Sequence, residues 1–170
     1  MILGWLRRKP TASALVVDRL SETLAAALNT RGKVYAKFGE IKAVQTTEVT
    51  PIETVLADGR KETKNVAQIG DWIVTNPGGG RYVVKPEKFA KLYGPKAGSP
   101  GVYVPKGRVV AVQNTVVYKK PVSTMASWGE MQTGAADCWW ADTCDEAGKR
   151  EGNPRIIGAA EFAQTYRLVA

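Results

Sequence analysis

Two carboxylates are the first residues in the chain that could do chemistry. Asp71 opens the run Asp-Trp-Ile-Val, and Asp137 opens the similar run Asp-Cys-Trp-Trp. If the two runs are equivalent, the carboxylates could face one another and act as a coupled acid–base pair. We favour the alternative that each accepts backbone hydrogen bonds in the turn before its strand. The chain has no histidine, so Ser-His and Cys-His nucleophilic pairs are excluded.

A glycine-rich loop offers a second candidate. Residues 76–80 read Asn-Pro-Gly-Gly-Gly and are followed by Arg81, a combination that could cradle a phosphate. Specific phosphate loops lie between a strand and a helix and add a fixed Lys-Ser/Thr. Here both flanking runs, 72–75 and 82–84, have strand character. The sequence therefore predicts a hairpin turn, with the phosphate cradle as the alternative.

Tryptophans are the third candidates. In a strand, Trp139 and Trp140 point to opposite faces, so one is expected in the core and the other exposed or covered by another part of the chain. An exposed tryptophan beside Arg81 or Arg155 would suit an unknown protein partner or a small planar ligand, and packing between modules is the alternative. The predicted binding residues are Asp71, Trp72, Arg81, Asp137, Trp139, Trp140 and Arg155.

The two cysteines, Cys138 and Cys144, do not have the spacing of a metal motif. A zinc site usually needs four ligands, and no histidine is present to complete one. We expect buried or incidental free thiols, since a disulfide does not suit a cytoplasmic protein. No metal and no cofactor is predicted.

The charge is positive but dispersed. The chain carries a net charge of +8 and 44% hydrophobic residues, enough to bury a core. Basic and acidic residues alternate throughout, which predicts a solvated mixed surface; weak, salt-sensitive binding to nucleic acid is the alternative. No run has the length of a membrane helix. The first residues place apolar side chains before charges, unlike a secretory signal, so a cytoplasmic location is expected.

The N-terminal region, 1–32, is predicted to contain a short lead and one amphipathic helix. An apolar stripe over residues 12–29, formed by Val16, Leu20, Leu24 and Leu28, predicts this helix. The helix is expected to pack on the rest of the protein, with self-association through 12–29 as the alternative. The lead, residues 1–10, contains Leu3, Trp5 and Leu6, which by default dock on the protein's own core; a frayed terminus is the next interpretation, and a partner or a membrane surface is a further alternative.

From residue 33 onwards the sequence repeats itself. Segment 34–47 recurs at 102–115 with an offset of 68 residues, and segment 83–93 recurs at 156–166 with an offset of 73. Matched residues in a fixed order predict two tandem copies of one module, 33–95 and 101–170. Residues 96–100 form a linker rich in small residues and proline.

For each copy the sequence predicts the same order of elements: a strand pair broken at a glycine, a hairpin, a central strand, a loop, a last strand and a short helix. The hairpins are expected to turn at Asp58-Gly59 and at Trp128-Gly129. The fold class is therefore α+β: an N-terminal helix, then two tandem β-rich modules with mostly antiparallel strands, each ending in a short helix. The copies differ most in the loop 142–154, and variable loops on a constant scaffold commonly carry binding.

One segment resembles a known family. Gly70-Asp71-Trp72 and the residues after it, together with downstream Lys85-Pro86, Phe89 and Tyr93, resemble the small bacterial and phage proteins of the PGDYG family. The resemblance covers about residues 65–95 and has an echo at 136–166. Ile69, Trp72 and Ile73 depart from the Pro-Gly-Asp-Tyr-Gly motif. The family has no established activity, so the resemblance implies no catalytic residue.

The sequence thus predicts a non-enzymatic binding or accessory protein of bacterial or phage origin. The expected binding region is a cleft between the modules or the loop 142–154. The alternatives are a weak, non-specific nucleic-acid binder and a small enzyme that uses Asp71 and Asp137.

Overall fold

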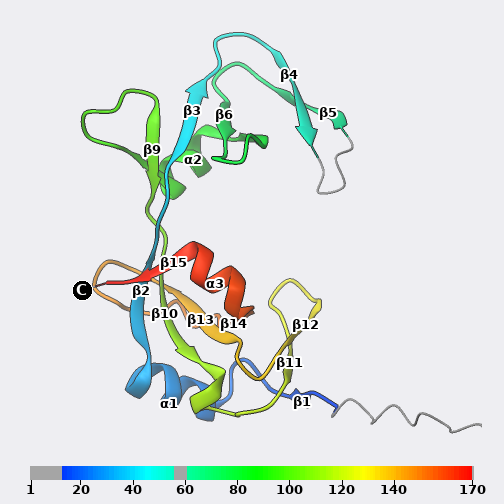
Figure 1. Ribbon diagram of the computed structural model, residues 1–170, viewed down its shortest axis with the longest axis vertical. Coiled ribbons are helices and arrows are strands. Elements are labelled where there is room, and N and C mark those ends of the chain that lie inside the picture. The colour runs from blue at the N-terminus through cyan, green and yellow to red at the C-terminus, as the bar shows by residue number, and fades with distance from the viewer. Residues whose placement is uncertain (1–12, 56–60, 170) are drawn as a thin grey trace, which may run out of the picture. The chain divides into compact units, whose positions relative to one another are not determined.

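The computed structural model describes residues 13–55 and 61–169 (Figure 1). The fold is α+β with mostly antiparallel sheets, as predicted, and three α-helices lie among these residues. The elements are β1 (Leu15–Val16), α1 (Glu22–Arg31), β2 (Lys33–Lys37), β3 (Ile41–Gln45), β4 (Thr50–Val55), β5 (Lys61–Ala67), β6 (Trp72–Thr75), β7 (Arg81–Val84), α2 (Pro86–Leu92), β8 (Tyr93–Pro95), β9 (Val102–Pro105), β10 (Arg108–Gln113), the 3-10 helix η1 (Asn114–Val116), β11 (Val122–Met125), β12 (Met131–Gly134), β13 (Trp139–Cys144), β14 (Arg155–Ile157), α3 (Ala159–Thr165) and β15 (Tyr166–Leu168). None of the described helices is long and apolar enough to cross a membrane.

The chain divides into two compact units. Unit 1 comprises residues 1–36 and 108–170, and unit 2 comprises residues 37–107. The chain therefore leaves unit 1 after β2 and returns to it at β10. Gly39, with φ +107°, lies in the first of these passages, where its missing side chain permits a backbone turn that other residues resist.

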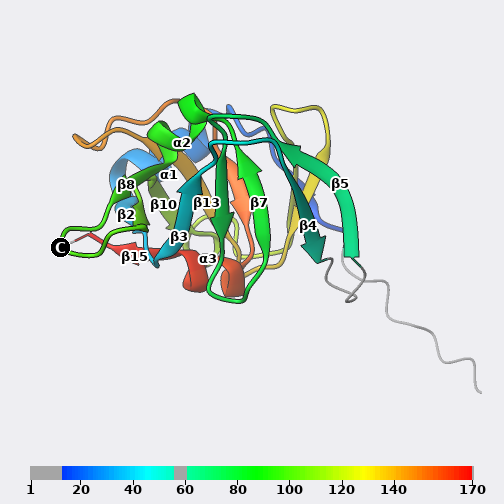
Figure 2. The same ribbon diagram turned by 90° about the horizontal axis from the view of Figure 1, so that it is seen from above.

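Unit 2 is built on a five-stranded antiparallel sheet in the order β7-β6-β3-β9-β8. In Figure 1, β9 lies beside β3, and the register pairs Lys42 with Val102. The separate hairpin β4–β5 lies beside β7 (Figure 2). The predicted turn of this hairpin, Asp58-Gly59, falls outside the described residues.

Unit 1 contains a five-stranded sheet in the order β14-β13-β10-β2-β15 and a three-stranded sheet in the order β1-β11-β12. The register of β10 with β2 pairs Val110 with Val34. In the smaller sheet, β1 runs parallel to β11, and β11 forms a hairpin with β12. The turn predicted at Trp128-Gly129 is confirmed, because the Ala126 N–H donates to the Glu130 carbonyl across it.

The two five-stranded sheets correspond strand by strand. In each sheet an α-helix joins the two edge strands: α2 joins β7 to β8, and α3 joins β14 to β15. Short helices were predicted to end the two copies; α2 and α3 lie near those positions, but each is followed by a further short strand, β8 or β15. In each sheet one strand comes from the other predicted copy. β2 lies in the segment 33–95 but pairs with β10, and β9 lies in the segment 101–170 but pairs with β3. The predicted boundaries 33–95, 96–100 and 101–170 describe a repeat in the sequence and stay a prediction.

The predicted helix over 12–29 is wrong in its bounds. α1 begins at Glu22 and ends at Arg31. Ser21 is its N-cap and accepts a hydrogen bond from the Leu24 backbone N–H, a favourable end for a helix. The Leu20 N–H donates to the Asp18 side chain, and this local turn separates β1 from the helix.

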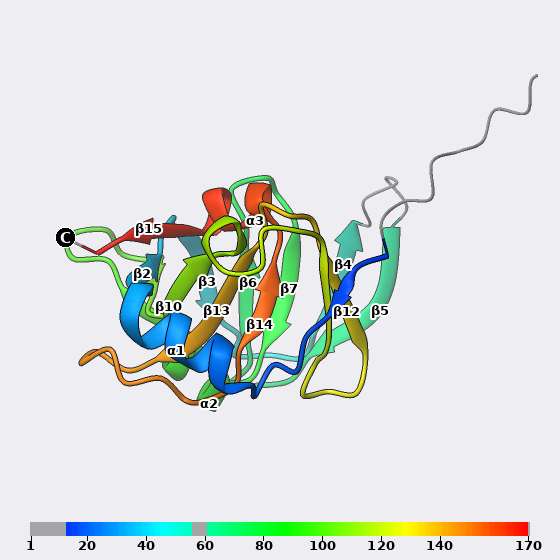
Figure 3. The ribbon, with the colours of Figure 1, turned by 90° about the horizontal axis from the view of Figure 1, so that it is seen from below.

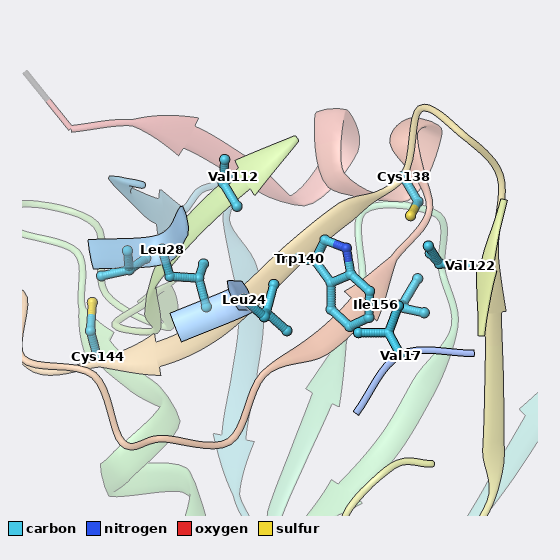
Figure 4. Close-up of a cluster of buried hydrophobic side chains, with 10 residues drawn as sticks. Val17, Leu24, Leu28, Val112, Val122, Cys138, Trp140, Cys144 and Ile156 are labelled. Carbon is cyan, nitrogen blue, oxygen red and sulfur yellow. The ribbon is translucent and has the colours of Figure 1, made fainter. Parts of the chain in front are cut away.

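α1 nevertheless buries the second half of the predicted stripe. Leu24 and Leu28 are buried, whereas Val16 and Leu20 are exposed. The helix lies across the five-stranded sheet of unit 1 (Figure 3). In Figure 4 the side chains of Leu24 and Leu28 point from α1 into a cluster that includes Trp140.

Candidate functional site

Trp72 of unit 2 belongs to a compact aromatic cluster. Its ring stacks on Phe89 of α2, with centroids 3.9 Å apart and an angle of 4° between the planes. Tyr103 of β9 meets both rings edge-on, at 5.3 and 5.0 Å. The nearby Tyr82 and Tyr93 hydroxyls are hydrogen-bonded at 2.8 Å. Burial, and to a smaller extent this hydrogen bond, raises the pKa of Tyr82. Trp72 is thus a packing residue of the sheet face under α2.

Unit 1 contains the same arrangement around Trp139. This ring stacks on Phe162 of α3 at 4.0 Å and 7°. Tyr35 of β2 meets both rings edge-on, at 5.4 and 5.0 Å. Arg155 donates to the hydroxyl of Tyr166 at 3.3 Å and is therefore engaged in the framework. In each cluster, the edge-on tyrosine comes from the strand that the other sequence segment supplies.

Trp140 points to the opposite face from Trp139, as predicted. It is fully buried, and its Nε1–H donates to Asn114 Oδ1 at 3.2 Å. The Asn114 amide donates in turn to the carbonyls of Lys120 and Ala136. Because a buried indole N–H needs an acceptor, this network explains why a polar asparagine is buried at the start of η1, directly after β10.

The sheet registers correct the predicted equivalence of Asp71 and Asp137. Trp72 pairs with Gln45, and Trp139 pairs with Gln113. The Gln45 side chain donates to the Gly70 carbonyl, and the Gln113 side chain donates to the Asp137 carbonyl. Asp137 therefore corresponds to Gly70, and Asp71 corresponds to Cys138. The backbone agrees: the Asp71 carbonyl accepts from the Thr46 N–H, and the Cys138 carbonyl accepts from the Asn114 N–H. The sequence match was wrong by one residue, which in a strand exchanges the two faces.

Asp71 is held in a specific structural environment. Its residue exposure is only 3%, and its carboxylate accepts from the Gln68 backbone N–H at 2.9 Å and from Lys85 Nζ at 3.0 Å. The backbone bond, with help from Lys85, lowers the pKa of Asp71. This agrees with the favoured interpretation of Asp71 as a turn acceptor. Asp137, in contrast, is exposed.

The loop 76–80 is a hairpin turn between β6 and β7, as predicted. The Asn76 N–H donates to the Gly80 carbonyl, and the Gly79 N–H donates to the Asn76 carbonyl. One side of this turn borders a hollow of about 360 Å³, next to Lys42 and Thr75. Arg81 is exposed at the start of β7.

Cys138 and Cys144 are free and buried, as predicted. Burial, with a smaller contribution from Asp137, raises the pKa of Cys138 to about 11, and burial likewise raises the pKa of Cys144. Both are therefore protonated thiols at neutral pH, a form with little nucleophilicity. Across residues 13–55 and 61–169, no group of three or more His, Cys, Asp or Glu side chains is placed to hold a metal ion.

The loop 142–154 is organised around a buried carboxylate. Asp142 has no exposed surface and pairs with Arg150 Nη1 at 2.6 Å. It also accepts from the backbone N–H groups of Gly152 and Asn153, both at 3.0 Å. Since breaking such a buried pair leaves a charge without compensation, Asp142 fixes the base of the loop.

An apolar groove in unit 1 was not predicted from the sequence. It is bordered by residues 16–20 on one side and 124–131 on the other, and its volume is about 690 Å³. Four exposed large apolar side chains line it: Val16, Leu20, Met125 and Met131. The exposed Trp128 lies in the turn between the lining residues Ser127 and Gly129. Met125 and Met131 form a cross-strand pair of the hairpin β11–β12. We call this region the apolar groove.

The sequence held only a partial signal for this groove. Val16 and Leu20 were assigned to a helix stripe, so their exposure was not anticipated. The two methionines flank a five-residue turn, which places them opposite one another once the hairpin forms. Which face of that hairpin is open depends on what packs against it, and local sequence does not report this.

A family model matches a large part of the chain. The PGDYG protein family matches residues 63–167, more than half of the chain. No curated protein and no solved structure matches this chain. The chain therefore belongs to the PGDYG protein family.

Proposed function

We propose that this chain is a non-enzymatic binding protein that takes an apolar polypeptide segment into the apolar groove of unit 1. The observation that carries the proposal is that four exposed large apolar side chains line one groove, with the exposed Trp128 in the adjoining turn. Val16 is 73% exposed and Trp128 is 56% exposed. Contiguous apolar surface of this kind is typical of interaction sites.

The chemistry of the groove suits a peptide. Methionine side chains are unbranched and adapt to different apolar partners, and tryptophan is a common energetic anchor of interfaces. The strand β1 stands at the end of its three-stranded sheet, a position where an extended segment can add as a further strand. Asp18 and Arg19 both line the groove, and Glu130 is exposed beside it. The three charged side chains therefore leave an excess of one negative charge, which modestly favours basic residues next to the apolar segment.

The test is a titration with two synthetic peptides that share one alternating apolar sequence and differ in their flanks, two arginines or two glutamates. We expect saturable binding of the arginine peptide and weaker binding of the glutamate peptide. Met131→Asp should weaken binding at least tenfold, because it places a charge in the groove. Val44→Asp, a change at an exposed valine of unit 2, should leave binding unchanged. Equal binding to all three proteins would exclude the groove as the site.

The other predicted routes have less support. The loop 142–154 is held by Asp142 and Arg150, so its base has a structural task, although its tip could still contact a partner. An enzyme using Asp71 and Asp137 loses its motivation, because the two residues do not correspond in register. Nucleic-acid binding, a cytoplasmic location and a bacterial or phage origin stay predictions from the sequence.

We further propose that the two units arose by duplication of one module, with the first strand of each copy exchanged. Matching strand orders, matching registers and two matching aromatic clusters support this. Tyr35 and Tyr103 are the informative residues, because each joins the cluster of the other copy.

A further inference from the structure

We infer that unit 2 has a docking site of its own, which takes an amphipathic helix with acidic residues from a partner protein. The site is centred on three cross-strand neighbours of the unit 2 sheet, Val44, Ile73 and Val83, which we call the open row. It is independent of the apolar groove, which lies in unit 1.

The open row is an apolar sheet face that the described elements of unit 2 leave accessible. Val44 is 67% exposed, and Ile73 and Val83 are half-buried. α2 stacks Phe89 on Trp72, and neighbouring residues of a strand point to opposite faces. α2 therefore covers the face opposite the open row.

The matching row of unit 1 shows what covers such a face. Its members, matched strand by strand, are Val112, Trp140 and Ile156, and all three are buried. Leu24 and Leu28 of α1 point into the cluster that they form (Figure 4). Because the two sheets share one register, a helix with leucines four residues apart suits the same face of unit 2.

A hollow in unit 2 marks the place where the end of such a helix would lie. This hollow, of about 360 Å³, is lined by the cross-strand neighbours Thr75, Lys42 and Val102. Lys42 corresponds in register to Val110 of unit 1. α1 ends directly over Val110, since a Cβ added to Gly32 would lie 2.7 Å from its Cγ1. The hollow therefore corresponds to the space that the end of α1 fills in unit 1.

The charges on this face favour an acidic helix. Lys42 replaces a valine at the position over which α1 ends, and Arg81 is exposed on the same face of β7 as Val83. Glu40 also lines the hollow and is ion-paired with Lys96. These groups sum to an excess of two positive charges. A helix with an acidic residue four positions after its second leucine, opposite Lys42, is thus the best match.

The neighbouring strand edge favours a helix over an extended segment. In unit 1, the residues before α1 form β1, which adds in parallel to β11. The strand of unit 2 that matches β11 is β4, and Pro51 stands there in the place of Ser123, since each pairs four residues before the matched Gly70 or Asp137. Proline has no N–H to donate to an added strand. The edge of β4 is therefore poorly suited to strand addition, whereas the sheet face stays open.

The test uses two synthetic peptides of about 18 residues, long enough to be partly helical alone. Both carry leucines four residues apart, followed four positions later by glutamate in one peptide and by lysine in the other. In protein labelled with ¹³C at the isoleucine methyls, the glutamate peptide should shift the Ile73 resonance saturably. The resonance of Ile157, buried in unit 1, should stay unchanged. The lysine peptide should bind about tenfold more weakly at low salt.

Three variants at exposed positions locate the site. Val44→Asp should weaken binding of the glutamate peptide about tenfold or more, because it places a charge in the open row. Lys42→Glu should reverse the preference, so that the lysine peptide binds more tightly than the glutamate peptide. Val49→Asp, the same substitution at an exposed valine of unit 2 outside the sheet, should bind both peptides as the unmodified protein does. Thermal melts followed by circular dichroism check that each variant is folded.

Several outcomes would overturn the inference. Equal binding of the glutamate peptide to the unmodified protein and to Val44→Asp would exclude the open row, and an unchanged preference in Lys42→Glu would exclude the acidic match. Self-association in sedimentation that Val44→Asp abolishes would assign the row to a second copy of the chain. Absence of binding by both peptides would remove the site, whereas binding of the arginine-flanked peptide to the apolar groove would be unaffected.

Discussion

The two units share one sheet and differ in what covers it. In unit 1, a row of cross-strand neighbours, Val112, Trp140 and Ile156, lies under α1. The matching row of unit 2 is Val44, Ile73 and Val83. Val112 is 4% exposed, whereas Val44 is 67% exposed.

The difference shows how one scaffold acquires two kinds of surface. α1 precedes the first strand of the repeat, and the elements described in unit 2 include no corresponding helix on that face. The covered row therefore works as core, while the matching row stays partly open to solvent. The same strand register does not imply the same energetic role.

A second difference concerns ionisable residues. Unit 2 has the paired Asp71 and Lys85 at the ends of β6 and β7. The corresponding positions of unit 1 hold Cys138 and Gly158. A buried thiol needs no charged partner, so unit 1 secures the same turn without an ion pair.

The largest expected effect tests the exchange of first strands. Tyr35→Ala should lower the free energy of unfolding by about 2–3 kcal/mol, because a half-buried ring and its contacts with Trp139 and Phe162 are lost. Hydrogen exchange should become faster in β13 and β14 but not in β6 and β7. Tyr103→Ala should do the reverse. Faster exchange in β6 and β7 on removal of Tyr35 would contradict the exchanged arrangement.

A smaller effect compares the covered and open rows. Val112→Ala should cost about 2 kcal/mol of unfolding free energy, since it removes buried methyl groups beneath α1. Val44→Ala, the same substitution at the matching register, should change it by less than about 0.5 kcal/mol. Denaturant titrations of both variants measure the difference. Similar losses would mean that the row of unit 2 is also covered in solution.

The smallest effect concerns Asp71 and depends on pH. Because hydrogen bonds from Gln68 and Lys85 lower the pKa of Asp71 in the folded state, its ionised form stabilises the fold. This contribution is fully present above the unfolded pKa, near pH 4, and is lost as the pH falls through the lower folded value. Asp71→Asn should therefore reduce Tm at pH 7, with the gap to the unmodified protein closing under acid conditions.

The control for that measurement is Asp137→Asn. Asp137 is exposed, and its correspondence with Gly70 gives its carboxylate no equivalent of the Asp71 contacts. We expect little change in Tm at neutral pH. A fall equal to that of Asp71→Asn would indicate that the side chain of Asp137 has a structural role after all.

Local features were predictable because local chemistry decides them. The turn at Trp128-Gly129, the hairpin at 76–80 and the two short helices follow from glycine, proline and apolar spacing. The first helix was predicted too long because Val16 and Leu20 continue the period of Leu24 and Leu28. Apolar spacing cannot distinguish a longer helix from a short strand and a turn whose apolar residues continue the same stripe. The N-cap at Ser21 sets the start of α1 at Glu22.

The candidate site was less predictable than the fold. Of the predicted binding residues, Trp140 is buried, Trp72 and Trp139 are stacked on phenylalanines, and Arg155 bonds within the framework. Their residue types suited binding, but the same types also suit a core. The apolar groove depends on Met125 and Met131, which have no distinctive spacing in the sequence.

The family, the α+β class and most local elements could be inferred from the residues alone, since each depends on residues close together in the chain. The pairing of β2 with β10 and of β9 with β3 became known from the three-dimensional structure. The first strands carry nearly the same residues, Val34-Tyr35 and Val102-Tyr103, so either sheet offers each strand an equivalent place. Each pairing joins residues that lie far apart in the chain, and short-range sequence patterns carry no information on which of two equivalent distant partners a strand meets.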